Sequence, residues 1–359
     1  MKRTDTPSPI NRVLYSQTGL PILQNRVYDT PQEAISCATG EVVLVENSKS
    51  GLVYNDAFRP EKITYDAAYN NEQANSSLFK QHLAEVADII GRTIGKESLV
   101  EVGCGKGFFL EMLLSQGFEV DGFDPAYEGC NPNVRKEYFH PDLGFHGKGL
   151  ILRHVLEHIQ DPYQFLCQLA LANGEQGLVY IEVPCVDWII DRNAWFDVFY
   201  EHVNYFRLSD FSRMFGRVLH AERIFGGQYL SIVADLASLT PPQRDPFDVV
   251  QFPSSFGQNL DYVKDNKTLA IWGGGSKGVI FSLLSQRAGF PIRTVIDINP
   301  AKQGKYLPVT GLSIQSPLQA LPSLPPGSTI LVMNSNYLEE IKQMSDKHFN
   351  FLGIDDGRS

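Results

Sequence analysis

A Glu-His pair among aromatic residues is the part of the sequence best suited to acid–base chemistry. Residues 199–206 read FYEHVNYF, with Glu201 beside His202. Histidine titrates near neutral pH, so it suits the removal of a weakly acidic proton. The same pattern also fits an aromatic core strand or helix with a polar edge, and the segment alone leaves both interpretations open.

A glycine-rich loop indicates a cofactor site elsewhere in the chain. Residues 101–107 read EVGCGKG and lie between a predicted strand and a predicted helix. Glycines let the backbone approach a ligand, and the loop opens onto a helix N-terminus. Asp124 ends the next strand, where an acid can accept hydrogen bonds from both hydroxyls of an adenosine ribose. This GxGxG spacing, with its preceding acid, resembles motif I of class I S-adenosylmethionine-dependent methyltransferases. The residues predicted to contact that cofactor are Glu101, Gly103, Cys104, Gly105, Gly107, Asp124, Pro125 and Arg153.

A second glycine-rich loop follows the predicted strand TLAIW. Residues 273–278 read GGGSKG, a GxGxxG pattern, and Asp297 ends the next strand. This pattern matches a dinucleotide site, but it is a weak signal when it occurs alone. Roughly 80 residues follow the loop, which leaves little room for the two mononucleotide halves of a full dinucleotide fold. A single half that binds one phosphate-bearing nucleotide and a purely structural loop both stay open.

Strands and helices alternate around these loops. An apolar pattern with helical spacing over 76–94 predicts a helix that leads into this region. Alternation of apolar strands with helices is typical of a mostly parallel sheet covered on both faces. We therefore expect an α/β fold: a Rossmann-like methyltransferase domain over 61–240, with a small irregular N-terminal unit over 1–60 and a second, smaller Rossmann-like domain over 241–359. Strands are predicted at 98–103, 118–124, 149–155 and 177–184, and helices at 108–116 and 162–172.

Composition limits the classes of partner. The 359 residues are 43% hydrophobic and carry a formal net charge of -10, so no basic surplus exists to neutralise nucleic-acid phosphates or an anionic membrane. No apolar run approaches the roughly 18 residues that span a bilayer. The five cysteines are scattered, which is typical of reduced thiols, and no apolar segment follows the charged N-terminus. We expect a cytoplasmic protein with a small-molecule substrate, present as a monomer or homodimer.

Taken together, the motifs resemble the sugar C-methyltransferase family over roughly residues 10–359. EVGCGKG, RHVLEHIQDP (153–162), IEVP, FYEHVNYF, GGGSKG and DINPAKQGKYLP occur in the same order. The resemblance implies an N-terminal zinc-binding unit, a methyltransferase domain and a Rossmann-like C-terminal domain. It also implies that S-adenosylmethionine methylates a carbon next to a ketone on a nucleotide-linked deoxysugar.

The resemblance also implies roles for individual residues. Glu201 and His202 match the family's catalytic Glu-His pair, His158 matches a nearby inward histidine, and Tyr69 is the best match for an upstream tyrosine. Carbon methylation needs an enolate, so His202 would act as general base, while a tyrosine or second histidine would stabilise the oxyanion. The backbone of Arg153 would meet the methionine amino group. Substrate contacts are expected at Tyr200, Gly275, Ser276 and Lys277.

The sequence departs from the family at the zinc positions and near the Glu-His pair. Tyr15, Thr18, Asn47 and Ser50 stand where the family has two CxxC pairs, and none of them supplies a thiolate, so we expect no metal. The N-terminal unit must then fold by its own packing. Phe199 stands where sugar-modifying members often have tyrosine, and the missing hydroxyl leaves the sugar substrate open to question.

Three other functions fit parts of the pattern. An O- or N-methyltransferase of a small molecule could use the same scaffold, with His202 as base for a hydroxyl or amine. An NAD(P)-dependent oxidoreductase would instead use residues 273–278. A binding protein that keeps the cofactor loop without turnover is the fourth possibility.

Overall fold

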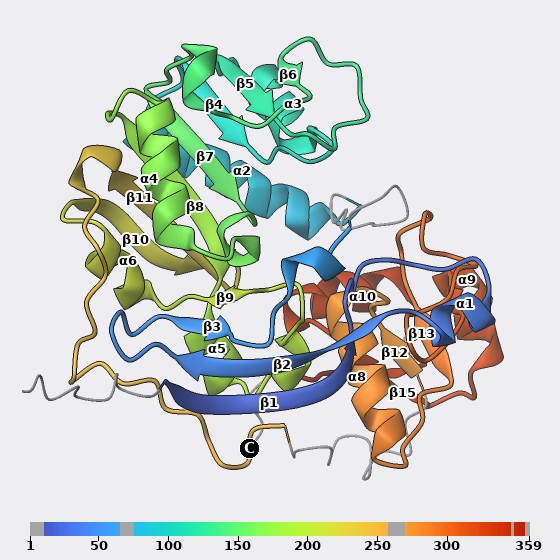
Figure 1. The fold of residues 1–359 in the computed structure, drawn as a ribbon. Coiled ribbons are helices and arrows are strands. Elements are labelled where there is room, and N and C mark those ends of the chain that lie inside the picture. The colour runs from blue at the N-terminus through green and yellow to red at the C-terminus, as the bar shows by residue number, and fades with distance from the viewer. Residues whose placement is uncertain (1–10, 65–74, 258–269, 346–347, 356–359) are drawn as a thin grey trace, which may run out of the picture.

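The computed structural model describes residues 11–64, 75–257, 270–345 and 348–355. Within these residues three sheets form, one for each part of the chain that the sequence distinguishes. Figure 1 shows the largest sheet at the top of the view, with the N-terminal strands below it and the C-terminal sheet at the lower right.

The largest sheet has its switch point next to the first glycine-rich loop. The chain runs from β4 to β5 and β6 on one side, then returns to β7 and β8 on the other side of β4. Ligands bind in such sheets at the carboxyl ends of the strands where the order reverses, here between β4 and β7. Among the described strands of this sheet, only β11 runs antiparallel to both of its neighbours. In sheet order the strands are β10 (Val218–Ile224), β11 (Tyr229–Asp235), β8 (Leu178–Pro184), β7 (Gly149–Arg153), β4 (Leu99–Val102), β5 (Val120–Phe123) and β6 (Val134–Arg135).

The helices around this sheet begin and end as their sequences predict. The α2 helix starts where the Ser76 side chain accepts the backbone N–H of Phe79, and it buries an apolar face that includes Val86 and Ile90. The α4 helix starts in the same way, with the Asp161 carboxylate on the N–H of Gln164. The predicted strands and helices of this domain are thus present, and the predicted α/β fold is confirmed. The helices are α2 (Ser77–Thr93), α3 (Phe108–Ser115), α4 (Pro162–Ala172), α5 (Val186–Asp191) and α6 (Leu208–Met214).

The N-terminal unit is a regular antiparallel sheet, so the prediction of an irregular unit was wrong. Register shifts interrupt β1 between Val13 and Tyr15 and between Gln17 and Leu20, and they hide its alternation in the sequence. The last strand of this sheet, β9, comes from the FYEHVNYF segment, so the Glu-His pair precedes an edge strand of the N-terminal sheet. In sheet order the strands are β1 (Arg12–Pro21), β2 (Thr39–Glu46), β3 (Val53–Asn55) and β9 (Asn204–Tyr205), and the short helix α1 spans Pro31–Ile35.

Packing and hydrogen bonds occupy the positions where the resemblance places zinc ligands. The ring of Tyr15 meets Phe256 edge to face, with ring centroids 5.1 Å apart. The side-chain oxygen of Asn47 accepts the backbone N–H groups of Lys49 (2.9 Å) and Ser50 (3.0 Å), which closes the turn between β2 and β3. These contacts stabilise the turn and tie the unit to the segment that follows the largest sheet in the chain.

The C-terminal sheet is parallel throughout its described strands and also has a switch point. Strands lie on both sides of β12. The expectation that the residues after the second glycine-rich loop leave little room for two mononucleotide halves was therefore wrong. In sheet order the strands are β14 (Ile314–Gln315), β13 (Thr294–Ile296), β12 (Ala270–Trp272), β15 (Thr329–Val332) and β16 (Asn350–Gly353). The helices are α8 (Ser276–Arg287), α9 (Pro317–Ala320) and α10 (Leu338–Met344). The 3-10 helices of the described residues are η1 (Pro60–Lys62), η2 (Pro141–Leu143), η3 (Leu156–His158), η4 (Trp195–Asp197), η5 (Leu236–Ser238), η6 (Leu321–Ser323) and η7 (Ser335–Tyr337).

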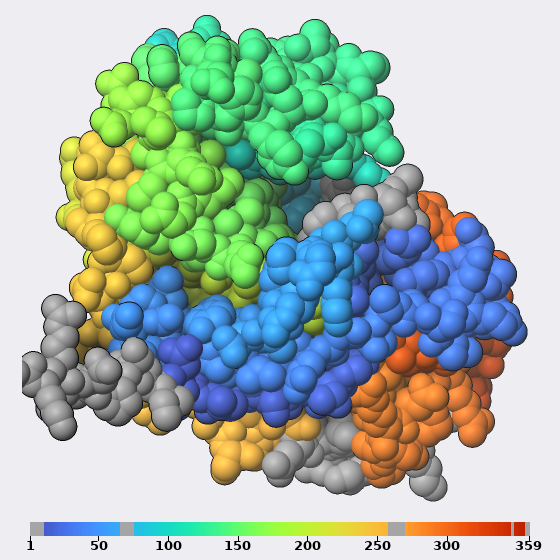
Figure 2. All heavy atoms as spheres, in the orientation of Figure 1, coloured from blue at the N-terminus to red at the C-terminus, as the bar shows by residue number. Residues whose placement is uncertain are grey.

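The three parts pack against one another. Figure 2 shows the N-terminal unit in blue, lying along the lower edge of the domain that holds the largest sheet and reaching the orange C-terminal domain. Trp195 of η4 stacks on Phe281 of α8, with centroids 5.5 Å apart and an interplanar angle of 12°. Glu340 of α10 accepts hydrogen bonds from the Ser76 hydroxyl (2.6 Å) and the Ser77 N–H (2.8 Å) at the start of α2. Among the described residues, no helix combines the length and apolar character needed to cross a membrane.

Candidate active site

A cavity of about 240 Å³ lies between the central domain, which holds the largest sheet, and the C-terminal domain. One wall comes from the segment after β7 and from the FYEHVNYF segment. The opposite wall comes from the second glycine-rich loop and the residues after β13. The lining residues that matter below are Asn25, His154, Glu157, His158, Phe199, His202, Gly275, Ser276, Lys277, Asp297 and Lys302.

His202 lies in an aromatic wall of this cavity. Its ring is 4.9 Å from the ring of Phe199 and 5.0 Å from that of His158, both measured between centroids and both close to edge-to-face. Burial, reinforced by the nearby charges of His158 and His154, holds the pKa of His202 well below its ordinary value. His202 is therefore neutral at physiological pH, with a lone pair available to accept a proton.

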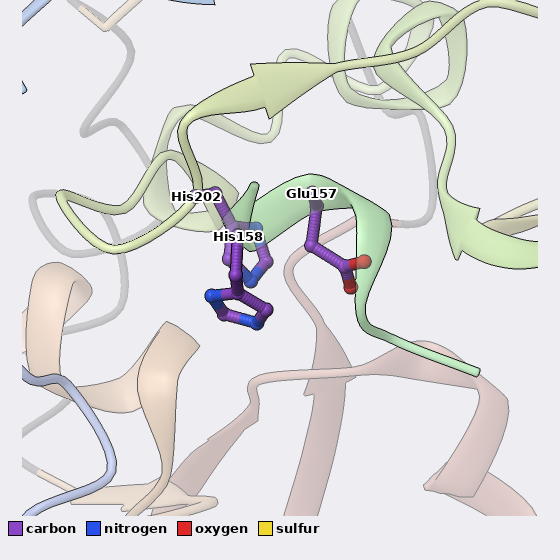
Figure 3. A group of neighbouring side chains, drawn as sticks. All are labelled: Glu157, His158 and His202. Atoms are coloured by element: carbon purple, nitrogen blue, oxygen red, sulfur yellow. The ribbon is translucent and has the colours of Figure 1, made fainter. Parts of the chain in front are cut away.

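His158 points the same way as His202, as Figure 3 shows. Its Nδ1 lies 3.0 Å from the backbone carbonyl oxygen of Glu201, a pure acceptor, so Nδ1 carries the proton. That bond fixes both the tautomer and the orientation of the ring. It also links η3 to the segment that carries His202.

Glu201 is buried against the N-terminal unit. Its carboxylate accepts the backbone N–H of Gln24 at 3.3 Å. Tyr200 is fully buried too, and its hydroxyl accepts the backbone N–H of Arg59 at 3.0 Å. Tyr200 thus faces the N-terminal unit, which corrects the predicted substrate contact.

Glu157, His158 and His202 have the residue types of a metal site. One ligand atom from each lies within 4.8 Å of the others. However, the Oε1 atom of Glu157 already contacts the Nδ1 atom of His154 at 3.2 Å. Burial lowers the pKa of His154, but hydrogen bonds to Glu157 and Glu182 outweigh burial and raise it to about 9. A positive imidazolium on the carboxylate repels a cation, so we assign none of the three as a metal ligand. The predicted absence of a metal stays a prediction.

The first glycine-rich loop has the backbone that its sequence predicts. Gly103, Gly105 and Gly107 have φ of 76°, 56° and 79°, a left-handed region that favours glycine. The N–H of Gly105 donates to the Oδ2 atom of Asp124 at 2.8 Å, so the acid after β5 holds the loop after β4. The loop and its acid therefore form one unit at the switch point.

Glu101 is buried behind this loop with an unsatisfied oxygen. Its Oε2 atom has no hydrogen-bond partner, and burial, opposed by Arg153 and assisted by Asp124, raises the pKa of this carboxyl to about 8. A buried carboxylate without a donor is costly unless a ligand supplies one. The ammonium group of a methionine moiety is such a donor, so these residues fit S-adenosylmethionine.

Three other residues, Cys104, Pro125 and Arg153, are predicted to contact the cofactor, and each has a different setting in the structure. Cys104 is buried, and its sulfur packs where a Cβ on Gly122 would lie (2.9 Å), so its role here is packing. Pro125 follows Asp124 in an exposed turn. Arg153 is paired with Glu182 at 2.8 Å, and its guanidinium lies 4.4 Å from the ring centroid of Phe109.

The second glycine-rich loop is held in a similar way but is lined by cations. The N–H of Gly274 donates to the Oδ2 atom of Asp297 at 2.8 Å. Lys302 is 6% exposed, and its amine lies 3.2 Å from the point that a Cβ on Gly275 would occupy. The amine thus lies beside the N-terminus of α8, where helix N–H groups also favour an anion.

Lys277 and Ser276 have partners within the protein. The amine of Lys277 lies 3.2 Å from a carboxylate oxygen of Asp197 and 3.8 Å from one of Asp355, so its charge joins the C-terminal domain to η4. The hydroxyl of Ser276 accepts from the side-chain amide of Asn25 at 2.8 Å. Lys277 therefore lines the cavity with a charge that carboxylates of the protein already match, and its predicted substrate contact stays a prediction.

Comparisons with known proteins agree with the cofactor site. Residues 71–218 match a family described as a methyltransferase domain. C-methyltransferase NovU of Streptomyces niveus is 26% identical over 319 residues, covering 76% of this chain and 75% of NovU. The chain is an S-adenosylmethionine-dependent methyltransferase.

Solved structures similar to this methyltransferase include two with S-adenosylhomocysteine bound. The 1,6-didemethyltoxoflavin-N1-methyltransferase of Burkholderia thailandensis is 12% identical and covers 53% of this chain and 97% of its own, with a TM-score of 0.32. The plantazolicin methyltransferase BpumL, solved with a triazolic desmethylPZN analog, is 14% identical and covers 45% and 86%, with a TM-score of 0.35. TM-scores of this size do not establish a common substrate site.

The predicted site residues of this methyltransferase lie in two neighbouring regions of the structure. His158 and His202 meet Gly275, Ser276 and Lys277 in the cavity, whereas the 101–107 loop lies at the end of β4 and supplies none of the described lining residues. Tyr69 lies outside the described residues.

Sequence reasoning missed Lys302 and gave His154 and Glu157 only a structural or cofactor-lining role. His154 and Glu157 lie in the RHVLEH motif, which carried a signal for them, but their joint contact depends on the turn after β7. Lys302 lies in DINPAKQ, where its sequence gives no sign that it turns back towards Gly275.

Proposed function

We propose that this methyltransferase methylates a carbon next to a ketone on a nucleotide-linked sugar or a similar polar metabolite, with His202 as general base. The proposal rests on one observation. The same cavity has a neutral histidine on one wall and a buried lysine at a helix N-terminus on the other wall. An acceptor that uses both walls has a reacting ketone at one end and an anionic group at the other. Similarity to a C-methyltransferase supports methylation at carbon.

His202 supplies the acid–base chemistry. S-adenosylmethionine, when bound, supplies an electrophilic methyl group. His202 takes the proton from the carbon next to the ketone, and the electron pair of the broken C–H bond moves into the enolate, with negative charge on its oxygen. The aromatic ring of Phe199 packs edge to face on His202, and this partial desolvation favours the neutral base.

His158 and Glu201 hold the base in place. The hydrogen bond from His158 Nδ1 to the Glu201 carbonyl (3.0 Å) fixes the backbone immediately before His202. The Glu201 carboxylate fastens the same residue to Gln24 of the N-terminal unit. In this proposal Glu201 is a positioning residue, and His158 both positions the segment and faces the substrate.

The C-terminal wall supplies the anion site. Lys302 and the N-terminus of α8 converge beside Gly275, where the absence of a side chain leaves room for a phosphate. Asn25 holds the Ser276 hydroxyl at the same helix end. A diphosphate on the acceptor matches this combination of one lysine and helix N–H groups.

The test is to identify the methylated atom. Wild-type protein is incubated with nucleotide-linked keto-deoxysugars and S-adenosylmethionine carrying a carbon-13 methyl group, and the product is examined by NMR. We expect a new C–CH3 signal, lost in His202→Ala although S-adenosylhomocysteine binding changes little, and retained in the control His146→Ala, an exposed histidine. A methyl on oxygen or nitrogen, or turnover retained in His202→Ala, would overturn the proposal.

A further inference from the structure

Two consecutive residues of the N-terminal unit bind the two walls of the cavity. The backbone N–H of Gln24 donates to the Oε1 atom of Glu201 at 3.3 Å, immediately before the base His202. The side-chain amide of Asn25 donates at 2.8 Å to the hydroxyl of Ser276, the first residue of α8. Consecutive Cα atoms lie about 3.8 Å apart across a trans peptide, so the span between the two contacts is short. One step of the chain therefore joins the wall with the base to the wall with the anion site.

The segment that carries these two residues is itself held on both sides. Residues 20–25 are buried. Before the two contacts, the N–H of Ile22 donates to the carbonyl of Ala38 at 3.1 Å and continues the pairing of β1 with β2. After them, Tyr28 and Tyr306 of the C-terminal domain exchange backbone hydrogen bonds of 3.1 and 3.0 Å. A buried segment that is hydrogen-bonded on both sides opens seldom, so it can hold its partners in fixed positions.

The N-terminal unit also binds the far end of α8. At the last residue of this helix, the Arg287 guanidinium donates to the carbonyls of Thr18 and Gly19 in β1, both at 2.7 Å. The helix has 12 residues, so this attachment lies about 17 Å from the one at Ser276. Two attachments so far apart restrict the tilt of α8 as well as the position of its first residue.

The attachment at Ser276 belongs to the anion site. Asn25 is 5% exposed and lines the cavity. Its Oδ1 atom lies 3.5 Å, and the amine of Lys302 lies 3.2 Å, from the point that a Cβ on Gly275 would occupy. Because the Ser276 oxygen accepts from Asn25, the hydroxyl proton of Ser276 is left for another acceptor. An anionic group of the substrate beside Gly275 is such an acceptor.

The wall with the base rests on the same N-terminal unit. β9 pairs with β3, and the Tyr200 hydroxyl accepts the backbone N–H of Arg59 at 3.0 Å. The two walls also meet directly, through the stacked rings of Trp195 and Phe281 and through the ion pair between η4 and α8. These direct contacts keep the domains together when Asn25 is changed, so its variants test position and not assembly.

We propose that Gln24 and Asn25 form a brace that fixes the start of α8 relative to the segment with His202, and that Asn25 thereby determines specificity for acceptors with an anionic group. The brace concerns the free protein. The specificity rests on the proposed function, because it requires the anion site beside Lys302. Asn25 is a positioning residue in this scheme, since it acts through Ser276.

Hydrogen–deuterium exchange of the free protein tests the brace. Asn25→Leu keeps a side chain of similar size and removes the hydrogen bond. We expect the amides at the start of α8, including Val279, which donates to the carbonyl of Gly275 at 3.0 Å, to exchange about 3- to 10-fold faster. Ser276→Ala removes the same bond from its other side and should have the same effect. Unchanged exchange in both variants would overturn the brace, whatever reaction the enzyme catalyses.

Asn47→Ala is the matched control for this experiment. Asn47 belongs to the same unit and closes the turn between β2 and β3 through the N–H groups of Lys49 and Ser50. The control should leave exchange at the start of α8 unchanged. Equally fast exchange there in Asn47→Ala would indicate a general loosening of the N-terminal unit and would contradict a specific brace.

Acceptor selectivity tests the second part of the inference. The value of kcat/KM is measured for a keto-deoxysugar linked to a nucleoside diphosphate and for the same sugar as an uncharged methyl glycoside. We expect the ratio of the two values to fall about 10-fold in Asn25→Leu and in Ser276→Ala, with S-adenosylhomocysteine affinity unchanged. The double variant should lose no more than either single variant, because both remove one bond.

A merely structural role for Asn25 predicts a different result. General damage lowers kcat/KM for both acceptors and leaves their ratio unchanged. An unchanged ratio in Asn25→Leu, or losses that multiply in the double variant, would therefore contradict the role assigned to Asn25.

Failure of this inference differs from failure of the proposed function. If exchange at α8 rises in the variants but the wild-type enzyme does not prefer the nucleotide-linked acceptor, the proposed anion site fails and the brace stands. If the wild type prefers that acceptor while exchange and selectivity are unchanged in both variants, the inference fails and the proposed function stands.

Discussion

The two glycine-rich loops share a backbone design and differ in charge. In each, the first glycine donates its N–H to the next strand at 2.8 Å, Gly103 to Phe123 and Gly273 to Ile296. In each, the acid that follows that strand then accepts a loop N–H at 2.8 Å. Loop geometry therefore does not separate the two sites, and the side chains around each loop must decide its ligand.

The residues around the loops point to ligands of opposite sign. The two loops differ at the position two residues before their first glycine. The first loop has Glu101 there, buried and with an unsatisfied oxygen, whereas the second loop has the buried Ile271. Beside the second loop lies the buried amine of Lys302. A carboxylate suits an ammonium group, and an amine at a helix N-terminus suits a phosphate. In our proposal one chain thus repeats one loop and uses it for a cationic group in one domain and an anionic group in the other.

The largest effect expected is on stability, from adding a methyl group to each loop. A Cβ on Gly278 would lie 1.8 Å from the carbonyl oxygen of Gly273, so Gly278→Ala must move backbone and should cost about 3 kcal/mol of unfolding free energy or more. Gly105 has nothing within 4 Å of its Cβ position and only a positive φ, so Gly105→Ala should cost about 1 kcal/mol. Urea unfolding of both variants compares them. Equal costs would show that the second loop is as open as the first.

The next effect is on cofactor binding at the first loop. Asp124→Ala removes the acceptor that holds the loop through Gly105 and would bind the ribose, and the affinity for S-adenosylhomocysteine should fall about 100-fold. Calorimetric titration of wild type and variant measures the change, with NADPH titrated in parallel. NADPH binding alone, unaltered in Asp124→Ala, would move the cofactor site to the second loop and break the comparison.

A smaller effect is expected for the cation of the second loop. Lys302→Met keeps the buried stem and removes the charge, so binding of a nucleoside diphosphate should weaken about 10-fold. S-adenosylhomocysteine affinity should not change, because Lys302 belongs to the other loop. Lys305→Met, which removes a more exposed amine paired with Asp29, is the matched control. Equal losses in the two lysine variants would argue against a specific anion site.

The smallest effect is the release of a proton when the cofactor binds at the first loop. Glu101 has its pKa raised to about 8, mainly by burial, so at pH 7 it is protonated in the free enzyme. An ammonium ligand favours the carboxylate, so cofactor binding should release a proton and strengthen severalfold as pH rises from 6.5 towards 8. Calorimetry in two buffers of different ionisation enthalpy measures the proton released. Glu101→Gln should release none from this position, and release equal to that of wild type would assign the proton to another group.

Much of the fold could be read from the sequence because its signals are local. Apolar strands alternate with helices, the glycine loops end strands, and acids follow the next strands, so the α/β fold and the cofactor loop were both predictable. The antiparallel N-terminal sheet was not, because bulges in β1 break its alternation and its last strand, β9, comes from residues 204–205, far along the chain. Pairing of a short strand with residues far away in the chain produces no periodic pattern in the sequence of that strand.

By itself the sequence determined the residue types at the two loops and at the Glu-His pair, and hence the kinds of chemistry available. Only the tertiary structure decided which groups meet. It turned Tyr200 towards Arg59, matched the charge of Lys277 with Asp197, and placed His154 between Glu157 and Glu182. The physical reason is that burial and the distance to other charges set the protonation state of a side chain, and both depend on residues remote in the chain.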